Sequence, residues 1–178
     1  VDRRRLVIVV ALSVLGVLAV PGSAEAQVPT PPHPTCSPGP TDCRAWHNAA
    51  VVTVSWATPP AGVVPESCDP EAISADTAGT LVSCTWWNAD HTEFQTTGVS
   101  AKRDATPPAI DVSPSRGPDS NGWYSRSLGV DISGGDSMSG LASCTPDRTY
   151  SGPDSGVAAV TGTCADHAGN TRSATFSF

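Results

Sequence analysis

The sequence predicts an all-β protein made of two small β-sandwiches in tandem, each held together by disulfides. The 178-residue chain contains 16 Gly and 17 Pro, which divide it into short segments. Several of these segments alternate apolar and polar residues with a period of two, which is typical of half-buried strands. The chain contains six cysteines, four of which recur as pairs at similar spacings in two parts of the chain. An even cysteine count in an exported chain indicates a disulfide framework.

Residues 1–26 have the features of a secretory signal peptide. A basic segment at residues 3–5 precedes an apolar run at residues 6–20, and Ala-Glu-Ala at residues 24–26 provides a small-x-small cleavage site. The apolar run is shorter than the roughly 20 residues that a membrane-spanning helix needs. We therefore expect a secreted, extracellular protein with no membrane span after cleavage.

The charge balance excludes two classes of partner. Cleavage after Ala26 removes three Arg, one Asp and one Glu, which changes the formal net charge from −7 to −8. An acidic chain without a basic stripe cannot replace the counterions of phosphates, so nucleic acids and anionic membranes are not expected partners. We expect instead an extracellular protein or polysaccharide, bound by a monomeric chain.

An internal repeat divides the mature chain. Trp46 precedes Cys68 by 22 residues, and Trp123 precedes Cys144 by 21. We therefore predict a proline-rich, mobile leader at residues 27–35, a first module at 36–104 and a second module at 105–178. The boundary falls in a stiff Thr-Pro-Pro linker, because proline cannot donate the backbone hydrogen bond that would extend a strand.

Alternation places the strands within each module. The first module has one clear strand, and the second has a series of them that ends in a closing strand with Ala174, Phe176 and Phe178 on one face. No segment after residue 26 has the periodicity of a helix. The predicted strands cover residues 52–56, 128–132, 141–144, 157–164 and 171–178.

The repeat also predicts the disulfides. Equivalent positions pair Cys68 with Cys84 and Cys144 with Cys164, and each bridge contributes about 3 kcal/mol in the chain-entropy account. Cys36 and Cys43 remain and bracket a turn-rich loop that a local bridge would close, although a bridge from Cys36 to another strand is the main alternative. We expect Trp46 and Trp123 to pack as core anchors over the bridges.

The second module resembles the bacterial Ig-like repeats of secreted and surface proteins, which are similar in pattern to hyalin-type repeats. The resemblance covers nearly all of residues 105–178. The motifs that carry it are Thr-Pro-Pro at 106–108, Asn-Gly-Trp-Tyr at 121–124, the turn from Asp136 to Gly140, and the segment Cys164 to Asn170.

The first module matches this pattern less completely. It keeps a Trp, the Cys pair and Asn88, but it has Ala89-Asp90-His91 where an Ala-x-Gly turn is expected. What the resemblance implies is an Ig-like sandwich that serves as a spacer, stalk or adhesive module.

No residue pattern predicts an active site. The four histidines, at positions 33, 47, 91 and 167, form no His-x-x-x-His or His-Glu-x-x-His pair. A Gly-x-Ser-x-Gly nucleophile motif is absent from the sequence. We therefore expect no catalytic residue and no cofactor, and we keep an unrecognised secreted hydrolase or inhibitor as an alternative.

Two turns are rich in oxygen ligands. Asp136 lies in one, and Asp166 and Asn170 lie in the other. If both turns meet at one end of the module, these residues are candidates for binding calcium, which prefers such ligands. The ordinary interpretation is that each side chain caps its own turn, and we weigh it above calcium.

Trp86-Trp87 offers a candidate ligand surface. Neighbouring residues of a strand face opposite sides, so an inward Cys84 implies an inward Trp86 and an outward Trp87. An outward Trp, extended by His91 and Phe94, could contact a sugar ring or a partner protein. The alternative, which we weigh above a ligand surface, is that Trp87 covers the junction between the modules or an irregular patch of its own module.

These observations lead to three hypotheses of function. The first is a secreted, non-enzymatic Ig-like protein that acts in adhesion, recognition or as a spacer at the cell envelope. The second is a pair of carbohydrate-binding modules that use exposed aromatic residues. The third is the unrecognised hydrolase or inhibitor.

Overall fold

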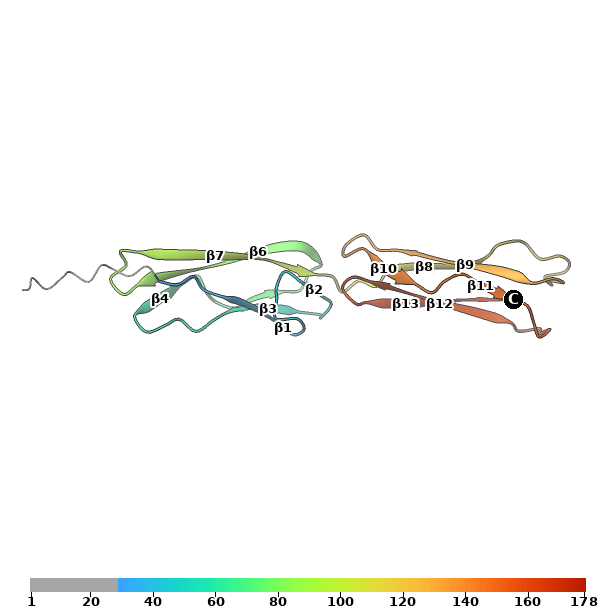
Figure 1. The fold of residues 1–178 in the computed structure, drawn as a ribbon, viewed down its shortest axis with the longest axis horizontal. Coiled ribbons are helices and arrows are strands. Elements are labelled where there is room, and N and C mark those ends of the chain that lie inside the picture. Colours follow the sequence, from blue (N-terminus) through green and yellow to red (C-terminus); the bar gives the residue numbers. More distant parts are fainter. Residues whose placement is uncertain (1–28) are drawn as a thin grey trace, which may run out of the picture.

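A computed structural model describes residues 29–178, which form strands and connecting loops without a helix. The expected signal peptide lies outside the described residues. Strand pairing does not cross residues 104–108 within this range, so the strands fall into two sets. The two sets lie end to end along the long axis of the molecule (Figure 1).

The first module contains a three-stranded sheet in the order β1-β3-β5 and a four-stranded sheet in the order β2-β7-β6-β4. Pairing is antiparallel except between β2 and β7, which run parallel. The strands are β1 (Pro34–Ser37), β2 (Trp46–His47), β3 (Val52–Trp56), β4 (Val63–Glu66), β5 (Glu71–Ile73), β6 (Thr77–Asn88) and β7 (Phe94–Arg103).

The second module contains two three-stranded sheets, ordered β11-β9-β8 and β10-β12-β13, in which every pair is antiparallel. All five strands expected from alternation across the two modules are present, with ends that differ by a few residues. The strands here are β8 (Ala109–Pro114), β9 (Leu128–Gly135), β10 (Leu141–Cys144), β11 (Arg148–Tyr150), β12 (Ala159–Asp166) and β13 (Thr171–Ser177).

The proline-rich leader differs from its expectation. Pro29 and Pro32 are buried, and β1 begins at Pro34. The backbone N–H of Ala57 donates to the carbonyl of His33 at 3.0 Å, which continues the pairing of β1 with β3. The expectation of a mobile spacer is therefore wrong for residues 29–35, because this segment packs on the first module.

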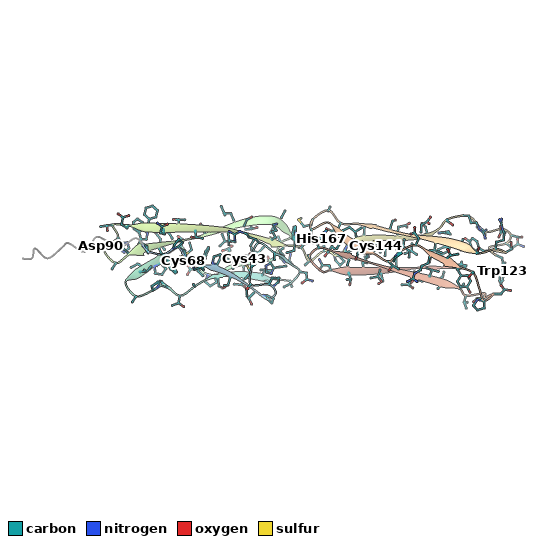
Figure 2. All side chains as sticks on the ribbon, in the orientation of Figure 1. Cys43, Cys68, Asp90, Trp123, Cys144 and His167 are labelled. Atoms are coloured by element: carbon teal, nitrogen blue, oxygen red, sulfur yellow. A yellow bond between two sulfur atoms is a disulfide. The ribbon has the colours of Figure 1, made fainter. Side chains whose placement is uncertain are left out.

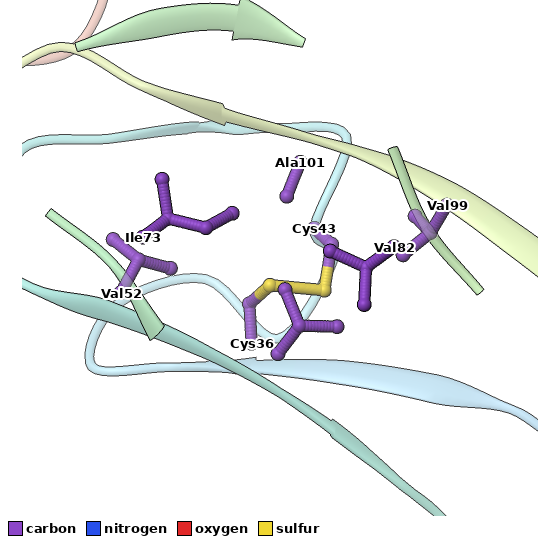
Figure 3. Packing of buried hydrophobic residues seen from close by; sticks show 8 residues of the cluster. Cys36, Cys43, Val52, Ile73, Val82, Val99 and Ala101 are labelled. Carbon is purple, nitrogen blue, oxygen red and sulfur yellow. A yellow bond between two sulfur atoms is a disulfide. The ribbon is translucent and has the colours of Figure 1, made fainter. Parts of the chain in front are cut away.

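The core of the first module surrounds a disulfide. Cys36 and Cys43 are each 2% exposed, and their bridge lies among aliphatic side chains from both sheets (Figure 3). The bridge thus links the short loop between Cys36 and Cys43 covalently to a core that has little apolar volume. The remaining members of this cluster are Val52, Val54, Ile73, Val82, Val99 and Ala101.

The core of the second module relies on close approach of its two sheets. Leu128, Val130 and Ile132 of β9 point inward, as their alternation predicts. A Cβ atom on Gly134 would lie 2.7 Å from Cys164 Sγ, and one on Gly162 would lie 2.6 Å from Ile132 Cγ2. Because contacts this short are not tolerated, glycine allows the strands to pack at this distance.

All six cysteines are paired in the structure. The bridges are Cys68–Cys84 and Cys144–Cys164, which are the two pairs expected from the repeat, and Cys36–Cys43, the local bridge expected for the remaining two cysteines. The alternative, a bridge from Cys36 to a distant strand, does not occur. Three disulfides indicate folding in an oxidising, extracellular environment.

The tryptophan anchors are not those expected. Trp123 is 61% exposed, so its assignment to the core is wrong. Trp46 is half-buried in the two-residue strand β2, and the Lys102 ammonium lies 5.6 Å from its ring. Trp86, 3% exposed, occupies the first module's interior instead. Trp46 begins a two-residue strand, and Trp123 lies in the connection between β8 and β9, where alternation does not determine which side chain turns inward.

Candidate functional site

Trp87 presents an aromatic surface at the free end of the first module. It lies on the face of β6 opposite to buried Trp86, as predicted, and is half-buried. Phe94 is its cross-strand partner on β7, with ring centroids 4.7 Å apart, and the His91 ring lies 5.7 Å away. The structure thus brings together the three candidate ligand-contact residues.

The geometry of this cluster limits what it can bind. The rings of Phe94 and His91 are tilted by 40° and 31° to Trp87 and partly cover it. Trp87 Nε1 donates a 2.6 Å hydrogen bond to Glu66 Oε2 on the edge strand β4. Phe94, 53% exposed, is the most accessible of the hydrophobic rings. The result is a small surface of mutually tilted rings rather than a flat platform.

The turn beside Trp87 forms without the expected glycine. Asn88 Oδ1 accepts hydrogen bonds from the backbone N–H groups of Thr92 and Glu93 at 2.9 and 3.1 Å. His91 takes the left-handed conformation with φ of 57°. The Thr92 hydroxyl and backbone N–H also bond Asp90 and hold the pKa of its carboxyl below the usual value. Local polar bonds therefore replace glycine here.

The second candidate region is the junction between the modules. One carboxylate oxygen from each of Asp104, Asp136 and Asp166 lies within 4.8 Å of the others. Asp104 and Asp166 are buried, at 0% and 3% exposure. The two oxygen-rich turns therefore meet at one end of the second module, as the calcium hypothesis requires, and are joined there by Asp104 from the linker.

The junction carboxylates already accept hydrogen bonds. Asp136 Oδ1 accepts from the N–H groups of Met138 and Gly140 at 3.0 and 2.8 Å. Asp166 Oδ1 accepts from the backbone of Asn170, and Asp166 Oδ2 accepts from the Asn170 amide, both at 2.8 Å. These bonds have the pattern of turn caps, which is the interpretation that the sequence favoured.

Asp104 connects the two modules directly. Its N–H donates to the carbonyl of His47 at 2.8 Å in the first module. Asp104 Oδ2 accepts from the N–H of Ser139 at 3.0 Å, and its carbonyl accepts from the Asn170 amide at 2.8 Å, both in the second module. This residue was absent from the sequence-based candidates, although an Asp side chain commonly accepts from the N–H two residues on, as Asp104 does here from Thr106 at 3.0 Å.

Asp76 holds the other side of the linker. Its carboxylate accepts hydrogen bonds from the Thr106 hydroxyl at 2.5 Å, the Ala105 N–H at 2.9 Å and the Arg103 guanidinium at 2.6 Å. These contacts, led by the Thr106 hydroxyl, lower the pKa of the Asp76 carboxyl. Arg103 in turn donates to the carbonyls of Ala49 and Ala50.

The histidines occupy separate places. His47 is buried, with ring nitrogens 3.4 Å from the carbonyl of Pro38 and 3.3 Å from that of Asp42. His167 Nδ1 lies 3.0 Å from the Gly140 carbonyl near the junction (Figure 2). Within residues 29–178, the junction aspartates are the one cluster of three or more His, Cys, Asp or Glu side chains close enough to share a metal ion.

The sequence was compared with protein-family models and with curated proteins. No family model and no curated protein matches the chain. Residues 29–178 include no helix long and apolar enough to span a membrane.

Proposed function

We propose that this chain is a secreted, non-enzymatic protein whose two modules are Ig-like sandwiches forming an extended spacer for adhesion or recognition at the cell envelope. The observation that carries the proposal is the junction, where buried Asp104 bonds to both modules. The three disulfides support an extracellular location. The acidic charge supports a protein or polysaccharide partner over nucleic acid.

A spacer must resist bending, and the linker chemistry supports this property. The linker is held on one side by Asp76 and Arg103 and on the other by Ser139 and Asn170. Proline at positions 107 and 108 further restricts the backbone. Asp104 is bonded to the first module through its backbone N–H and to the second through its carboxylate and carbonyl. Reorientation of the modules would therefore cost several hydrogen bonds, each worth about 1 kcal/mol.

Rotational diffusion tests the proposal. We expect ¹⁵N relaxation to give one rotational correlation time for both modules, with small-angle scattering that fits the end-to-end arrangement. Asp104→Ala should give each module its own, shorter correlation time. Asp111→Ala removes the same charge from an exposed position on β8 and serves as the control. Independent tumbling of the modules in the unaltered protein would contradict the spacer function.

A second candidate function is glycan binding at the Trp87 cluster, favoured by the contact of Trp87 with His91 and Phe94. Co-sedimentation with cell wall, chitin and cellulose tests it. Phe94→Ala should reduce retention, and Trp87→Ala should abolish it without lowering the melting temperature enough to unfold the first module. Equal retention of both variants and the unaltered protein would exclude this surface.

A further inference from the structure

The far end of the second module contains a hollow that neither candidate region includes. Its volume is about 670 Å³, within the range of small-ligand sites. It is lined by residues 121–128, by residues 150–156 except Pro153, and by Phe178. Trp123 marks this end of the molecule, opposite to the end at Asp90 (Figure 2).

Aromatic side chains line the hollow from three parts of the chain. Tyr124 and Tyr150 each meet Phe178 edge to face, with centroids 5.5 and 5.2 Å apart. Phe176 stacks on Phe178 at 5.3 Å and joins this cluster to β13. Trp123 stands beside these rings and remains 61% exposed. A large apolar side chain is thus held at the surface, next to partly buried rings.

The loop that carries Trp123 has a defined conformation. Asn121 and Gly122 both have positive φ, of 47° and 84°, and Ser120 pairs with Trp123 across them. This is the pattern of a two-residue type I′ hairpin, for which Asn-Gly is a preferred sequence. The turn directs the chain so that Trp123 lies outside the core.

Asp119 fixes the base of the same loop. Its carboxylate accepts hydrogen bonds from the N–H and hydroxyl of Ser125 and from the guanidinium groups of Arg116 and Arg126, all within 3.1 Å. These donors, with the Ser125 N–H first, hold the pKa of Asp119 well below its usual range. The Arg116 guanidinium also lies 5.2 Å from the Tyr124 ring. A site prepared in this way loses little conformational entropy on binding.

The polar part of the lining is nearly neutral. Arg126 is paired with Asp119 at 3.1 Å, whereas Asp154 has no ion-pair partner among residues 29–178. The other polar groups are the Asn121 amide, the hydroxyls of Tyr124 and Tyr150, and the serine hydroxyls at positions 125, 127, 151 and 155. Neutral donors and acceptors around aromatic faces suit a ligand with an apolar ring face and hydroxyl edges. A phosphate or other anion would be opposed by Asp154 and by the net charge of −7.

We propose that this hollow binds the end of a neutral glycan chain, with a pyranose ring against Trp123 and its hydroxyls bonded to Asn121, Asp154 and the serines. The site lies at the opposite end of the molecule from Trp87 and does not depend on glycan binding there. It gives the spacer a recognition surface at one tip. A proline-rich peptide is the competing occupant, because such segments also bind aromatic grooves.

Two substitutions test the site by different routes. Trp123→Ala removes the exposed ring, and its exposure means that folding should be unaffected. Gly156→Leu leaves Trp123 in place but fills the space before it, because a Cβ on Gly156 would lie 3.9 Å from Trp123 Cη2. Gly156 lacks a positive φ, so a side chain is compatible with its backbone. Trp87→Ala serves as the control for the other aromatic surface.

The experiment is a neutral-glycan array screen of the exported protein, followed by calorimetric titration with chitohexaose, cellohexaose or the best array ligand. We expect Trp123→Ala and Gly156→Leu each to weaken binding at least tenfold, with Trp87→Ala unchanged. Three results would overturn the proposal: no array ligand, unchanged affinity in both tip variants, or binding of a decaproline peptide in place of every glycan. Tumbling of the modules is measured separately, so failure here leaves the spacer function standing.

Discussion

Equivalent hairpins have different roles in the two modules. In the first, β6 and β7 turn at residues 89–93, at the free end, where Asn88 caps the turn beside Trp87. In the second, β12 and β13 turn at residues 167–170, where Asp166 and Asn170 face the linker. Similar turn chemistry thus supports an exposed aromatic surface at one place and an intermodule contact at the other.

The difference extends to the residue two positions after each repeated cysteine. Trp86 lies two residues after Cys84, and Asp166 lies two residues after Cys164. Trp86 and Asp166 are each 3% exposed. Strand geometry therefore points both inward, but one fills an apolar core and the other caps a polar turn at the junction. Equivalent backbone positions hold an apolar residue in one module and a charged residue in the other because their surroundings differ. One position lies inside a module, and the other lies at the boundary between modules.

The largest expected effect contrasts two tryptophans. Trp86→Ala should lower the free energy of unfolding of the first module by about 4 kcal/mol, since a buried ring is lost. Trp123→Ala should change it by less than about 0.5 kcal/mol for the second module. Urea denaturation followed by circular dichroism measures both. Trp86→Phe is the control, because it retains most of the volume and removes a buried N–H that lacks a partner; it should cost less than Trp86→Ala.

Removing one disulfide should have a slightly smaller effect on the free energy of unfolding, and the effect should be confined to one module. Replacing Cys144 and Cys164 together by Ala should destabilise the second module by about 3 kcal/mol and leave the melting of the first module unchanged. The bridge lies against Gly134, where the sheets approach closely, so its loss also leaves space in a small core. Differential scanning calorimetry should then resolve two transitions. A parallel decrease in both would show that the modules unfold as one unit.

Acid should weaken the junction through Asp76. Its hydrogen bonds lower the pKa in the folded protein, so their contribution is fully present above the unfolded pKa of about 3.9. It is lost as the pH falls through the lower folded value. We expect the modules to tumble more independently below about pH 3.9. The ¹⁵N relaxation difference between modules measures this, and Asp76→Asn should show it at neutral pH.

The smallest expected effect concerns the three junction carboxylates. Asp136→Asn keeps an acceptor for the N–H groups of Met138 and Gly140 but removes one of three neighbouring charges. We expect stabilisation by about 0.5 kcal/mol, greatest at low salt, because like charges at this distance repel. Thermal melting at two salt concentrations measures it.

The same variant separates turn capping from calcium binding. If the aspartates only cap their turns, a chelator should leave the melting temperature of the unaltered protein unchanged. If they hold calcium, the chelator should lower it, and Asp136→Asn should be destabilising in the presence of calcium rather than stabilising. The two interpretations therefore predict opposite signs for one substitution.

Alternation in the sequence was sufficient for five of the thirteen strands within residues 29–178 and for the inward side of the regular segments, and cysteine spacing was sufficient for the disulfide pairs. Alternation at Leu128, Val130 and Ile132 is a local property of an extended backbone, so it can be recognised without knowing the fold. Two of the cysteine pairs followed from a repeat whose spacing is equally visible, and Cys36 and Cys43 were the pair that remained. The outward direction of Trp87 followed from the same geometry once Cys84 was placed.

What only the tertiary structure decided lies at the ends of the modules. Asp104 lies close to Asp136 and Asp166, and Trp123 lines one hollow together with Phe178, although these segments are far apart in the sequence. Such contacts depend on how strands are ordered and where loops return, which no local period encodes. Trp123 was assigned to the core because its spacing repeats that of Trp46. Its exposure instead follows from an Asn-Gly turn and from the position of the loop beyond the sheets.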